Sequence, residues 1–409
     1  MQTSGEDGSV PQLLVAGGGI GALAAALAAQ RAGWTVQVFE QAQEFSEVGA
    51  GLQLGPNATR ILRAWGLESS LHAMAAFPDA VVARSLGDGR ELARLRLGAC
   101  SLERYGAPYA TMHRRDLHHL LLEGVRRHAV QLHLGCSATG FEETGEQVSL
   151  LGPEGPLAQG QALIGADGLW SRVRQQLLRD AAAQPTGHLA YRALIPRTDL
   201  PSAFRTNEVT AWLGPHQHGV TYPIRGGELL NLVLIVQGQQ PHGLQSWDDV
   251  ALADDVHRAL AHGCAALRDL AAAAAAWGCW TLCDRPPIAG PEEMARGRVA
   301  LLGDAAHPMR PFLAQGAAMA LEDAAELGLA LGSVKEVHAD LPSALGRYAQ
   351  KRWQRVARVQ QRSRRNGRLF HLGGGLQRAR DLALGLLGPR LMDVPWLYAY
   401  QGAVTADST

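Results

Sequence analysis

The sequence predicts an α/β fold in which a parallel-sheet domain is interrupted by a mostly antiparallel β-sheet domain and followed by a long C-terminal helix. Near the N-terminus, a glycine-rich turn joins an apolar strand to an apolar helix, which is how a βαβ unit begins. From 187 to 236, strand-like segments alternate with turn residues. The segment 342–368 has the pattern of one long helix.

The first βαβ unit covers about thirty residues. The pattern predicts a buried strand at 12–16, a helix at 20–32 and a second strand at 34–39, which ends at Glu40. The run 13–29 is apolar, but glycines interrupt it and it is slightly short for a membrane span. We therefore expect a buried strand and helix, and no membrane association.

The turn in this unit fits the pattern G-x-G-x-x-G/A. Gly17 permits the tight turn, Gly19 lets the backbone approach a pyrophosphate, and Ala22 is small enough for helix and strand to pack closely. The helix N-terminus offers N–H groups to phosphate, and a carboxylate at Glu40 is placed to accept hydrogen bonds from a ribose. These features predict a bound dinucleotide, and the turn alone does not distinguish FAD from NAD.

The later elements follow the same two periodicities. Helices are expected at 116–128, 248–276 and 315–331, the second because of its six-alanine run. Strands are expected at 163–166, 209–213, 219–223, 230–237 and 299–302. The strands at 163–166 and 299–302 are short and apolar like the first one, so they indicate that the chain returns to the parallel sheet after the antiparallel domain.

Composition excludes several classes of function. Lysine plus arginine and aspartate plus glutamate each number 38, so no charge excess indicates nucleic-acid binding. The five cysteines are scattered, without C-x-x-C, which argues against a disulfide framework or a metal site. The first ten residues lack the basic start of a signal peptide. We expect a cytoplasmic protein, a monomer or homodimer.

Two further motifs identify a family. Residues 163–172 read L-I-G-A-D-G-L-W-S-R, and residues 297–311 read G-R-V-A-L-L-G-D-A-A-H-P-M-R-P. With the N-terminal turn, they give the chain a clear resemblance to the class A flavoprotein monooxygenases of the salicylate, 3-hydroxybenzoate and 6-hydroxynicotinate hydroxylase group. The resemblance runs from Leu13 to about Gly367. It implies a p-hydroxybenzoate-hydroxylase-like fold with tightly bound, non-covalent FAD in a Rossmann-like domain.

The resemblance also implies limits for the domains. The FAD-binding domain is expected at 10–75, 101–180 and 285–335, the substrate domain at 76–100 and 181–284, and a C-terminal helical region at 336–409. NADH or NADPH is implied as a transient co-substrate, with O2. A flavin C4a-hydroperoxide then hydroxylates a small hydroxylated aromatic acid in such enzymes.

The resemblance assigns FAD contacts one by one. Glu40 matches the residue that holds the adenosine ribose, Arg114 an arginine on the phosphates, and Asp167 the aspartate of the Asp-Gly motif. Asp304 matches an aspartate on the ribityl or pyrophosphate region, and Pro311 a proline beside the reactive flavin edge. Further contacts are implied for Gln53, Gln315, Gly316 and Ala317. Ala314 and Ala318 depart from the family, which often has Gly and Asn there.

The substrate side centres on the segment 216–223, H-Q-H-G-V-T-Y-P. Positions four apart on a strand share a face, so His218 and Tyr222 are expected to line one surface, and His216 shares that face as a competing candidate. A histidine of near-neutral pKa suits removal of a phenolic proton. Members acting on 3-hydroxybenzoate and 6-hydroxynicotinate resemble this chain in having a His-x-x-x-Tyr pair.

The remaining cues on the substrate conflict. Tyr109 resembles an active-site tyrosine of the 3-hydroxybenzoate enzymes, whereas Met309-Arg310-Pro311 resembles the 6-hydroxynicotinate group. Gln53 stands where the latter group has histidine. Arg310 is a candidate partner for a substrate carboxylate or a solvated loop charge. A 6-hydroxynicotinate-type pyridine hydroxylase and a non-hydroxylating FAD oxidoreductase therefore remain as alternatives.

Overall fold

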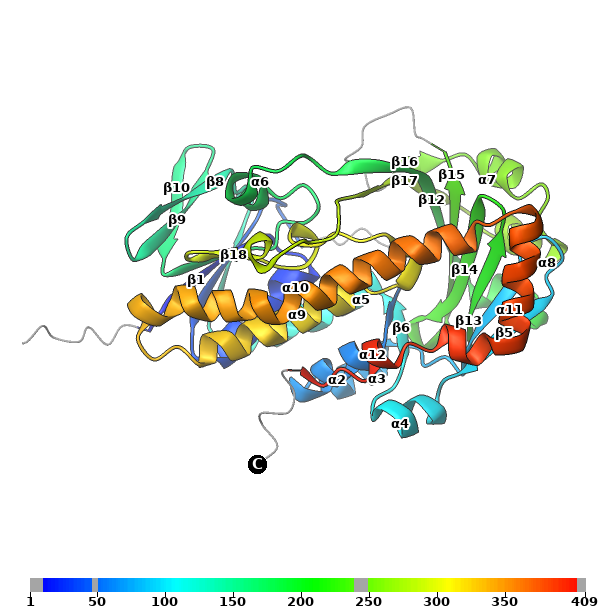
Figure 1. The fold of residues 1–409 in the computed structure, drawn as a ribbon, viewed down its shortest axis with the longest axis horizontal. Coiled ribbons are helices and arrows are strands. Elements are labelled where there is room, and N and C mark those ends of the chain that lie inside the picture. The colour runs from blue at the N-terminus through cyan, green and yellow to red at the C-terminus, as the bar shows by residue number, and fades with distance from the viewer. Residues whose placement is uncertain (1–9, 46–50, 239–248, 403–409) are drawn as a thin grey trace, which may run out of the picture.

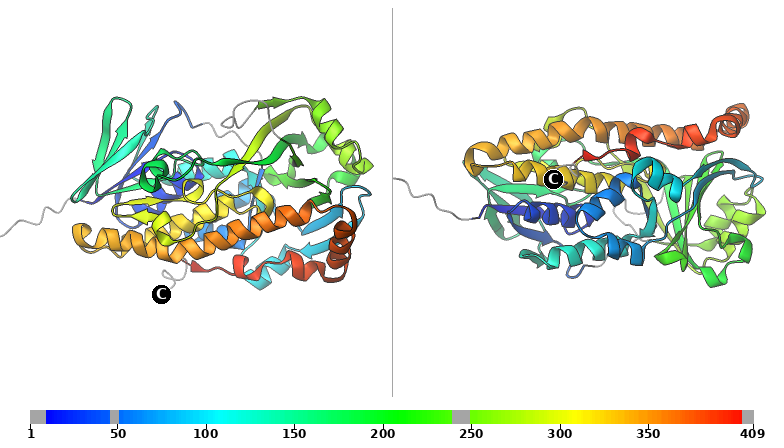
Figure 2. Two further views of the ribbon diagram at one scale, coloured as in Figure 1. Left: turned by 45° about the horizontal axis from the view of Figure 1, so that its top comes forward. Right: turned by 90° about the horizontal axis from the view of Figure 1, so that it is seen from below.

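The computed structural model describes residues 10–45, 51–238 and 249–402. The molecule is elongated, with the parallel sheet around β1 toward one end and the large sheet around β14 toward the other (Figure 1). The helix α10 (Val337–Phe370) extends past both sheets, and Figure 2 shows it along one side of the molecule. The structure confirms the predicted α/β class, and residues 403–409 of the expected C-terminal region lie outside the described residues.

The first sheet has six strands in the order β18-β19-β11-β1-β2-β7. Every neighbouring pair is parallel except β18 and β19 at the edge. The strands are β1 (Gln12–Ala16), β2 (Thr35–Glu40), β7 (Val130–Leu134), β11 (Ala162–Gly165), β18 (Ala295–Arg296) and β19 (Val299–Leu301). The chain therefore returns to this sheet after the antiparallel domain, as the apolar segments at 163–166 and 299–302 predict.

Helix α1 (Ile20–Arg31) is the centre of the core beside this sheet. Its alanines 22, 24, 25, 26 and 29 are completely or almost completely buried, which lets neighbouring helices approach closely. It contacts α5 (Arg114–Arg126) and α9 (Gly316–Gly332), and α9 in turn lies against α10. The short side chains of α1 thus fix how closely the N-terminal turn and the α9 N-terminus approach one another.

The second sheet has eight strands in the order β16-β17-β12-β15-β14-β13-β4-β5. Only the β13–β4 pair is parallel, so the expectation of a mostly antiparallel sheet is confirmed. The strands are β4 (Ala80–Ser85), β5 (Glu91–Arg96), β12 (Gln184–Pro196), β13 (Glu208–Gly214), β14 (Gln217–Ile224), β15 (Leu229–Gln237), β16 (Asp249–Ala251) and β17 (Trp277–Asp284). All eight fall inside 76–100 and 181–284, while the domain limits themselves stay a prediction.

The expected helix at 248–276 is wrong in its extent. Residue 248 lies outside the described residues, and the rest forms β16, α7 (Ala253–Ala259) and α8 (Ala265–Ala272). Only two residues of the six-alanine run are helical. Helix propensity is a weak preference that tertiary context overrides, and here the chain must leave α8 and enter β17 at Trp277, which is buried in the second core.

Smaller elements connect the two large sheets. The strands β3 (Gly51–Leu54) and β6 (Ala110–His113) form a two-stranded ribbon. This ribbon is tied to the eight-stranded sheet, because Gly51 N–H donates to Asn231 Oδ1 at 2.8 Å and Thr111 Oγ1 donates to the Pro223 carbonyl at 2.5 Å. The other elements are α2 (Pro56–Ala64), α3 (Glu68–Met74), α4 (Ala99–Tyr105), β8 (Gly140–Thr144), β9 (Gln147–Gly152), β10 (Gly155–Gly160), α6 (Arg172–Leu178), α11 (Gly374–Met392) and α12 (Pro395–Tyr398).

The basic stretch of α10 is buried where it meets α9. Arg352 is 0% exposed and pairs with Glu322 at 2.8 Å and with Asp323 at 2.7 Å. Arg355 binds Glu322 as well, at 2.6 Å. These arginines therefore join two helices inside the protein. No helix in the described parts of the chain is long and apolar enough to cross a membrane.

Candidate active site

A cavity of about 370 Å³ lies where the two sheets meet. Its wall combines the turn before α1, the β3 strand, side chains of β14, β15 and β17, and the loop 302–317. Eleven residues singled out in the sequence line it: Gly19, Gln53, Arg114, His218, Tyr222, Asp304, Arg310, Pro311, Gln315, Gly316 and Ala317. One cavity thus brings together residues as distant in the sequence as Gly19 and Ala317.

The glycine turn packs so closely against neighbouring parts of the protein that Gly17 and Gly18 leave no room for a side chain. Gly17 has φ of +104°, and a Cβ there would come within 2.4 Å of the Ala166 carbonyl oxygen. A Cβ on Gly18 would come within 2.8 Å of the Glu40 side chain. Glu40 thus stands beside the turn, and its Oε1 accepts the Ala42 N–H at 2.8 Å. Ala22, also predicted to be small for packing, is fully buried in the core.

Two helix N-termini open onto the cavity. The α1 terminus at Gly19 and the α9 terminus at Gln315 lack a side-chain cap, so their first N–H groups are left for a ligand. Arg114 and Asp304 lie on the same wall. Burial raises the pKa of Asp304, and the nearby charges of Arg114 and His307 oppose that rise. Bare glycine backbone, two positive helix ends and an arginine fit the pyrophosphate and the flavin of FAD.

Asp167 does not point into this cavity, although its neighbours Ala166 and Gly168 line it. Its carboxylate accepts hydrogen bonds from Ser171 Oγ at 2.5 Å, Arg172 N at 2.8 Å and Val173 N at 3.3 Å. This is the pattern of an acid that caps a helix, here α6. The structure therefore shows Asp167 stabilising the Asp-Gly turn, and any effect of this residue on FAD acts through the turn's backbone.

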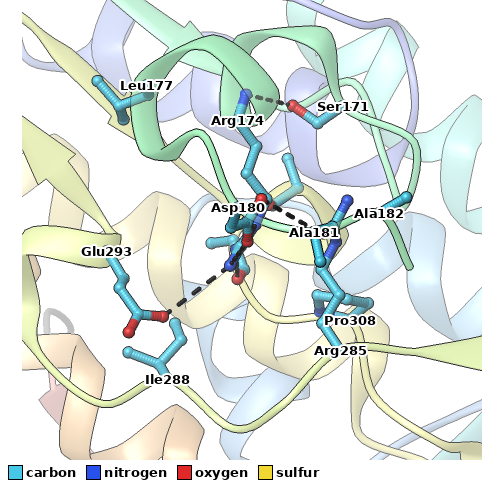
Figure 3. Close-up of polar contacts among 12 residues, drawn as sticks. Ser171, Arg174, Leu177, Asp180, Ala181, Ala182, Arg285, Ile288, Glu293 and Pro308 are labelled. Atoms are coloured by element: carbon cyan, nitrogen blue, oxygen red, sulfur yellow. Dashed lines mark hydrogen bonds and ion pairs between the residues drawn. The ribbon is translucent and has the colours of Figure 1, made fainter. Parts of the chain in front are cut away.

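Two buried arginines fix the turns behind the cavity (Figure 3). Arg174, from α6, donates to the carbonyls of Ala305 and Ala306 and pairs with Asp180 at 2.7 Å. Arg285 donates to the Ala181 carbonyl and pairs with the same Asp180 at 3.3 Å. Because Arg174 binds the Ala305 and Ala306 carbonyls, the Gly-Asp turn is connected directly to α6.

Helix α10 holds the loop that forms the floor of the cavity. Three of its side chains donate hydrogen bonds to carbonyls of this loop: Gln360 to Pro308 at 3.0 Å, Ser363 to Arg310 at 2.5 Å, and Asn366 to Phe312 at 3.0 Å. A loop would otherwise leave such buried carbonyls without partners. The position of Pro311, between two of these anchored carbonyls, therefore depends on α10.

The strand β14 brings His218 and Tyr222 to the cavity, as the spacing predicts. His218 is 1% exposed. Its ring lies between Phe312 and Phe370, with centroids 5.2 and 5.4 Å away, and its Nδ1 is 2.8 Å from Nε2 of His371. Burial, together with His371 and His188, lowers the pKa of His218 well below its ordinary value, so the ring is neutral at pH 7.

Tyr222 and Tyr109 meet at Gln53. The Tyr109 hydroxyl donates to Gln53 Oε1 at 2.6 Å, and the Gln53 side chain is also hydrogen-bonded to Tyr222. Burial raises the pKa of both tyrosines, which therefore remain neutral hydrogen-bond donors. Tyr109 is 5% exposed and does not line the cavity, so the structure places it one layer behind Gln53.

Two arginines, Arg192 and Arg310, bring positive charge to the cavity wall. Arg310 is no free loop charge, because its Nε lies 2.6 Å from Oδ2 of Asp284. Arg364 of α10 contacts the same Oδ2 at 3.1 Å. Arg192, from β12, stands 5.2 Å from the ring centroid of Trp280, and both line the cavity. Sequence patterns gave no reason to select Arg192, since one arginine on a strand has no motif around it.

The prediction for His216 is wrong. It lies in the turn between β13 and β14, with φ of +60°, and it is exposed and absent from the cavity wall. Strand alternation does not extend through such a turn. The histidines that do approach His218 are His188, from β12, and His371, which follows α10. Neither stands in a sequence motif, and only the folded chain brings them together.

The comparisons with known proteins agree with this geometry. Residues 10–363 match the model of a family described as FAD binding domain. The 3-hydroxybenzoate 6-hydroxylase of Polaromonas naphthalenivorans (strain CJ2) is 40% identical over 392 residues, which are 95% of this chain and 96% of that protein. A 3-amino-4-hydroxybenzoate 2-monooxygenase of Streptomyces platensis is 38% identical over 398 residues, 96% of this chain and 97% of that protein.

Solved structures extend the agreement to the fold. HpxO of Klebsiella pneumoniae, complexed with FAD and uric acid, has a TM-score of 0.81 and 26% identity, covering 93% of this chain and 95% of its own. A salicylate hydroxylase substrate complex also has a TM-score of 0.81, with 27% identity and 96% coverage of both chains. The nearly complete coverage shows that both sheets and the C-terminal helices have counterparts in these proteins.

Proposed function

The chain belongs to the family defined by this FAD binding domain, and from that premise we propose that it hydroxylates a small hydroxylated aromatic acid with NAD(P)H and O2. One observation carries the proposal. A buried, neutral histidine and a neutral tyrosine stand in the same cavity as the glycine turn and the two free helix ends. That arrangement brings a proton acceptor to the place where a ring would meet the flavin.

Different residues of the cavity would bind FAD and act on the substrate hydroxyl. The backbone of Gly19, the side chain of Arg114 and the N-terminus of α9 would hold FAD. When bound, reduced FAD activates O2 so that one oxygen atom is transferred to an electron-rich ring. His218 would accept the proton of the substrate hydroxyl at Nε2, because Nδ1 is already engaged with His371. Tyr222 would donate a hydrogen bond that orients the same oxygen.

The two arginines of the cavity wall favour an acid as substrate. Arg192 and Arg310 both line the cavity, and an anionic carboxylate is attracted to such a site because low polarity strengthens the charge interaction. Asp284 holds Arg310 in place. We therefore assign the carboxylate to these arginines and the ring hydroxyl to His218.

The test is a comparison of candidate substrates with the FAD-loaded protein. 3-Hydroxybenzoate, salicylate, 3-amino-4-hydroxybenzoate and 6-hydroxynicotinate are each supplied with NADH or NADPH. We expect one of the benzoates to stimulate NAD(P)H oxidation and to give a product heavier by one oxygen atom from labelled O2. Product oxygen derived from water would refute oxygen transfer, and stimulation without any hydroxylated product would favour a non-hydroxylating FAD oxidoreductase.

One observation favours a second candidate substrate, the pyridine 6-hydroxynicotinate. Met309 and Arg310 line the cavity directly before Pro311, and this Met-Arg-Pro sequence is similar to that of the 6-hydroxynicotinate group. Gln53 also lines the cavity, and its amide binds two tyrosines. A higher kcat/KM for 6-hydroxynicotinate than for every benzoate would move the assignment to this substrate.

A further inference from the structure

The imidazole rings of His218 and His371 are connected so directly that they share one hydrogen. Their facing nitrogens, Nδ1 and Nε2, are 2.8 Å apart. Two neutral imidazoles can make this contact only if one nitrogen carries the hydrogen and the other offers its lone pair. When His218 carries it, Nε2 of His218 is bare and acts as an acceptor toward the cavity. When His371 carries it, Nε2 of His218 is the donor.

The surroundings of His218 cannot support a positive charge. Its described neighbours are Phe312, Phe370, His188 and His371, none of which is an acid. A buried cation without a partner is strongly disfavoured. A His218 that takes a proton from a bound phenol at Nε2 therefore has to release its other proton from Nδ1, and the atom in contact with Nδ1 is Nε2 of His371.

His371 is placed where a proton can leave. It follows the last turn of α10 and is partly exposed, whereas His218 is not. Its carbonyl accepts the N–H of His216, which lies in the exposed turn at the surface. Burial lowers the pKa of His371 to about 4, and the neighbouring His188, His216 and Arg380 add to that shift. A proton that reaches His371 at pH 7 is therefore passed to water and not kept.

We propose that His371 is a positioning residue that relays the substrate proton out of the cavity. The hydroxyl proton of the bound phenol moves to Nε2 of His218, the Nδ1 proton of His218 moves to Nε2 of His371, and the Nδ1 proton of His371 moves to surface water. No electron is transferred, and both imidazoles end neutral with their tautomers exchanged. The inference rests on the proposed function, because it needs a phenolic substrate at His218.

The experiment measures proton release separately from turnover. FAD-loaded protein in unbuffered solution with a pH indicator is mixed rapidly with 3-hydroxybenzoate, and the phenolate absorbance of the bound ligand is recorded in parallel. His371→Gln keeps an acceptor for the His218 N–H but cannot relay, so we expect unchanged affinity and phenolate fraction with release about 10²-fold slower. His371→Phe removes the contact altogether and should lower the phenolate fraction as well.

His188→Gln is the matched control, because it alters the same cluster without touching the Nδ1–Nε2 contact. We expect its release rate to stay within about threefold of the wild type, a change too small for loss of a proton-transfer group. Release from His371→Gln at the wild-type rate would overturn the relay. Where that variant loses FAD or folds poorly, the proton-release rate of the wild type is measured in mixtures of H2O and D2O. A rate whose dependence on the D2O fraction requires more than one transferred proton supports the relay. A rate that requires only one transferred proton overturns it.

The wild-type measurement separates this inference from the proposed function. A wild-type chain that binds 3-hydroxybenzoate and forms phenolate, with an unaffected His371→Gln variant, refutes the relay alone. A wild-type chain that forms no phenolate with 3-hydroxybenzoate and releases no proton refutes the role of His218 toward that phenol, and the relay with it. The two failures therefore give different results in the same experiment.

Discussion

Replacing Asp323 by Asn tests whether a buried ionic network holds the Gly303–His307 turn at the cavity. Asp323 is 0% exposed. Its Oδ2 accepts the Gly303 N–H at 3.1 Å and lies 2.5 Å from Nε2 of His307, while its Oδ1 accepts from Nε of Arg352 at 2.7 Å. An amide of the same size keeps some of these hydrogen bonds but removes the charge, so Arg352 stays buried with one carboxylate fewer.

The magnitude can be obtained in two ways. Breaking a buried pair by removing one partner destabilises by about 3–5 kcal/mol, and we expect the lower end because Arg352 keeps Glu322. Separately, burial alone would raise the pKa of Asp323, but His307 and Arg352 outweigh it and bring the pKa to about 2 from its ordinary 3.8. That difference corresponds to roughly 2 kcal/mol.

The pH dependence has a definite sign. A carboxyl whose pKa is lower in the folded state stabilises the protein above the unfolded pKa, and that stability is lost as pH falls through the folded value. The contribution of Asp323 is therefore complete above about pH 5 and declines toward pH 2. The Asp323→Asn variant should lack this acid-sensitive part of the stability.

The assay is urea unfolding of the FAD-loaded protein at pH 7, with FAD retention measured by ultrafiltration. We expect Asp323→Asn to lose about 3 kcal/mol and to bind FAD more weakly, because the Gly-Asp turn loosens. Glu326→Gln, also buried on α9, is the matched control, since within the described residues the Glu326 side chain accepts one hydrogen bond, from the Tyr400 hydroxyl. A loss of stability no larger than that of the control would refute the reasoning.

The remaining predictions concern FAD, the loop and the base. Glu40→Ala should weaken FAD binding by roughly 1.5–3 kcal/mol, measured by fluorescence titration of apoprotein, and an unchanged Kd would contradict the ribose contact. Ala314 has φ of +51°, a conformation that favours glycine. Ala314→Gly should therefore raise the free energy of unfolding by about 0.5–1 kcal/mol in urea titrations, and a decrease would contradict strain at this residue. Because the pKa of His218 is lowered, kcat/KM should remain level as pH falls through 6.5, whereas a decline centred there would show an unperturbed base. His218→Asn should reduce hydroxylation about 10²–10⁴-fold with FAD content unchanged, and Tyr222→Phe should cost less; full coupled activity in His218→Asn would remove it as the base.

Features encoded over short distances could be predicted from the sequence. The strand at 12–16 is found with the predicted bounds, and the glycine turn is found where its spacing predicts, because strand, turn and helix are fixed by neighbouring residues. The His218–Tyr222 face is found for the same reason, since alternation holds inside β14. His216 failed because it lies one residue before that strand, in a turn where alternation no longer applies.

Contacts between distant residues could not be predicted in this way. Arg310 matched a motif, but nothing near it indicated that Asp284 would be its partner. His371 lies 153 positions from His218 and is preceded by no motif. Asp167 was correctly found as part of an Asp-Gly turn, yet only the folded chain shows that its carboxylate caps α6 and does not line the cavity. Pairing of this kind depends on tertiary packing, which a single sequence does not display.

Several contacts that the sequence did not predict come from α10 and from His371 directly after it. This helix is long enough to pass both sheets, so successive turns reach different parts of one site (Figure 1). Arg352 binds the network under the Gly-Asp turn, three side chains hold the loop around Pro311, Arg364 contacts Asp284, and His371 contacts His218. The loop and turn at the cavity and the proton acceptor are thus all contacted by α10 or by the residue directly after it. We infer that α10 helps to set the relative position of these parts. The sequence motifs identify the parts of the site, but α10 carries no such motif, so the motifs do not show what aligns them.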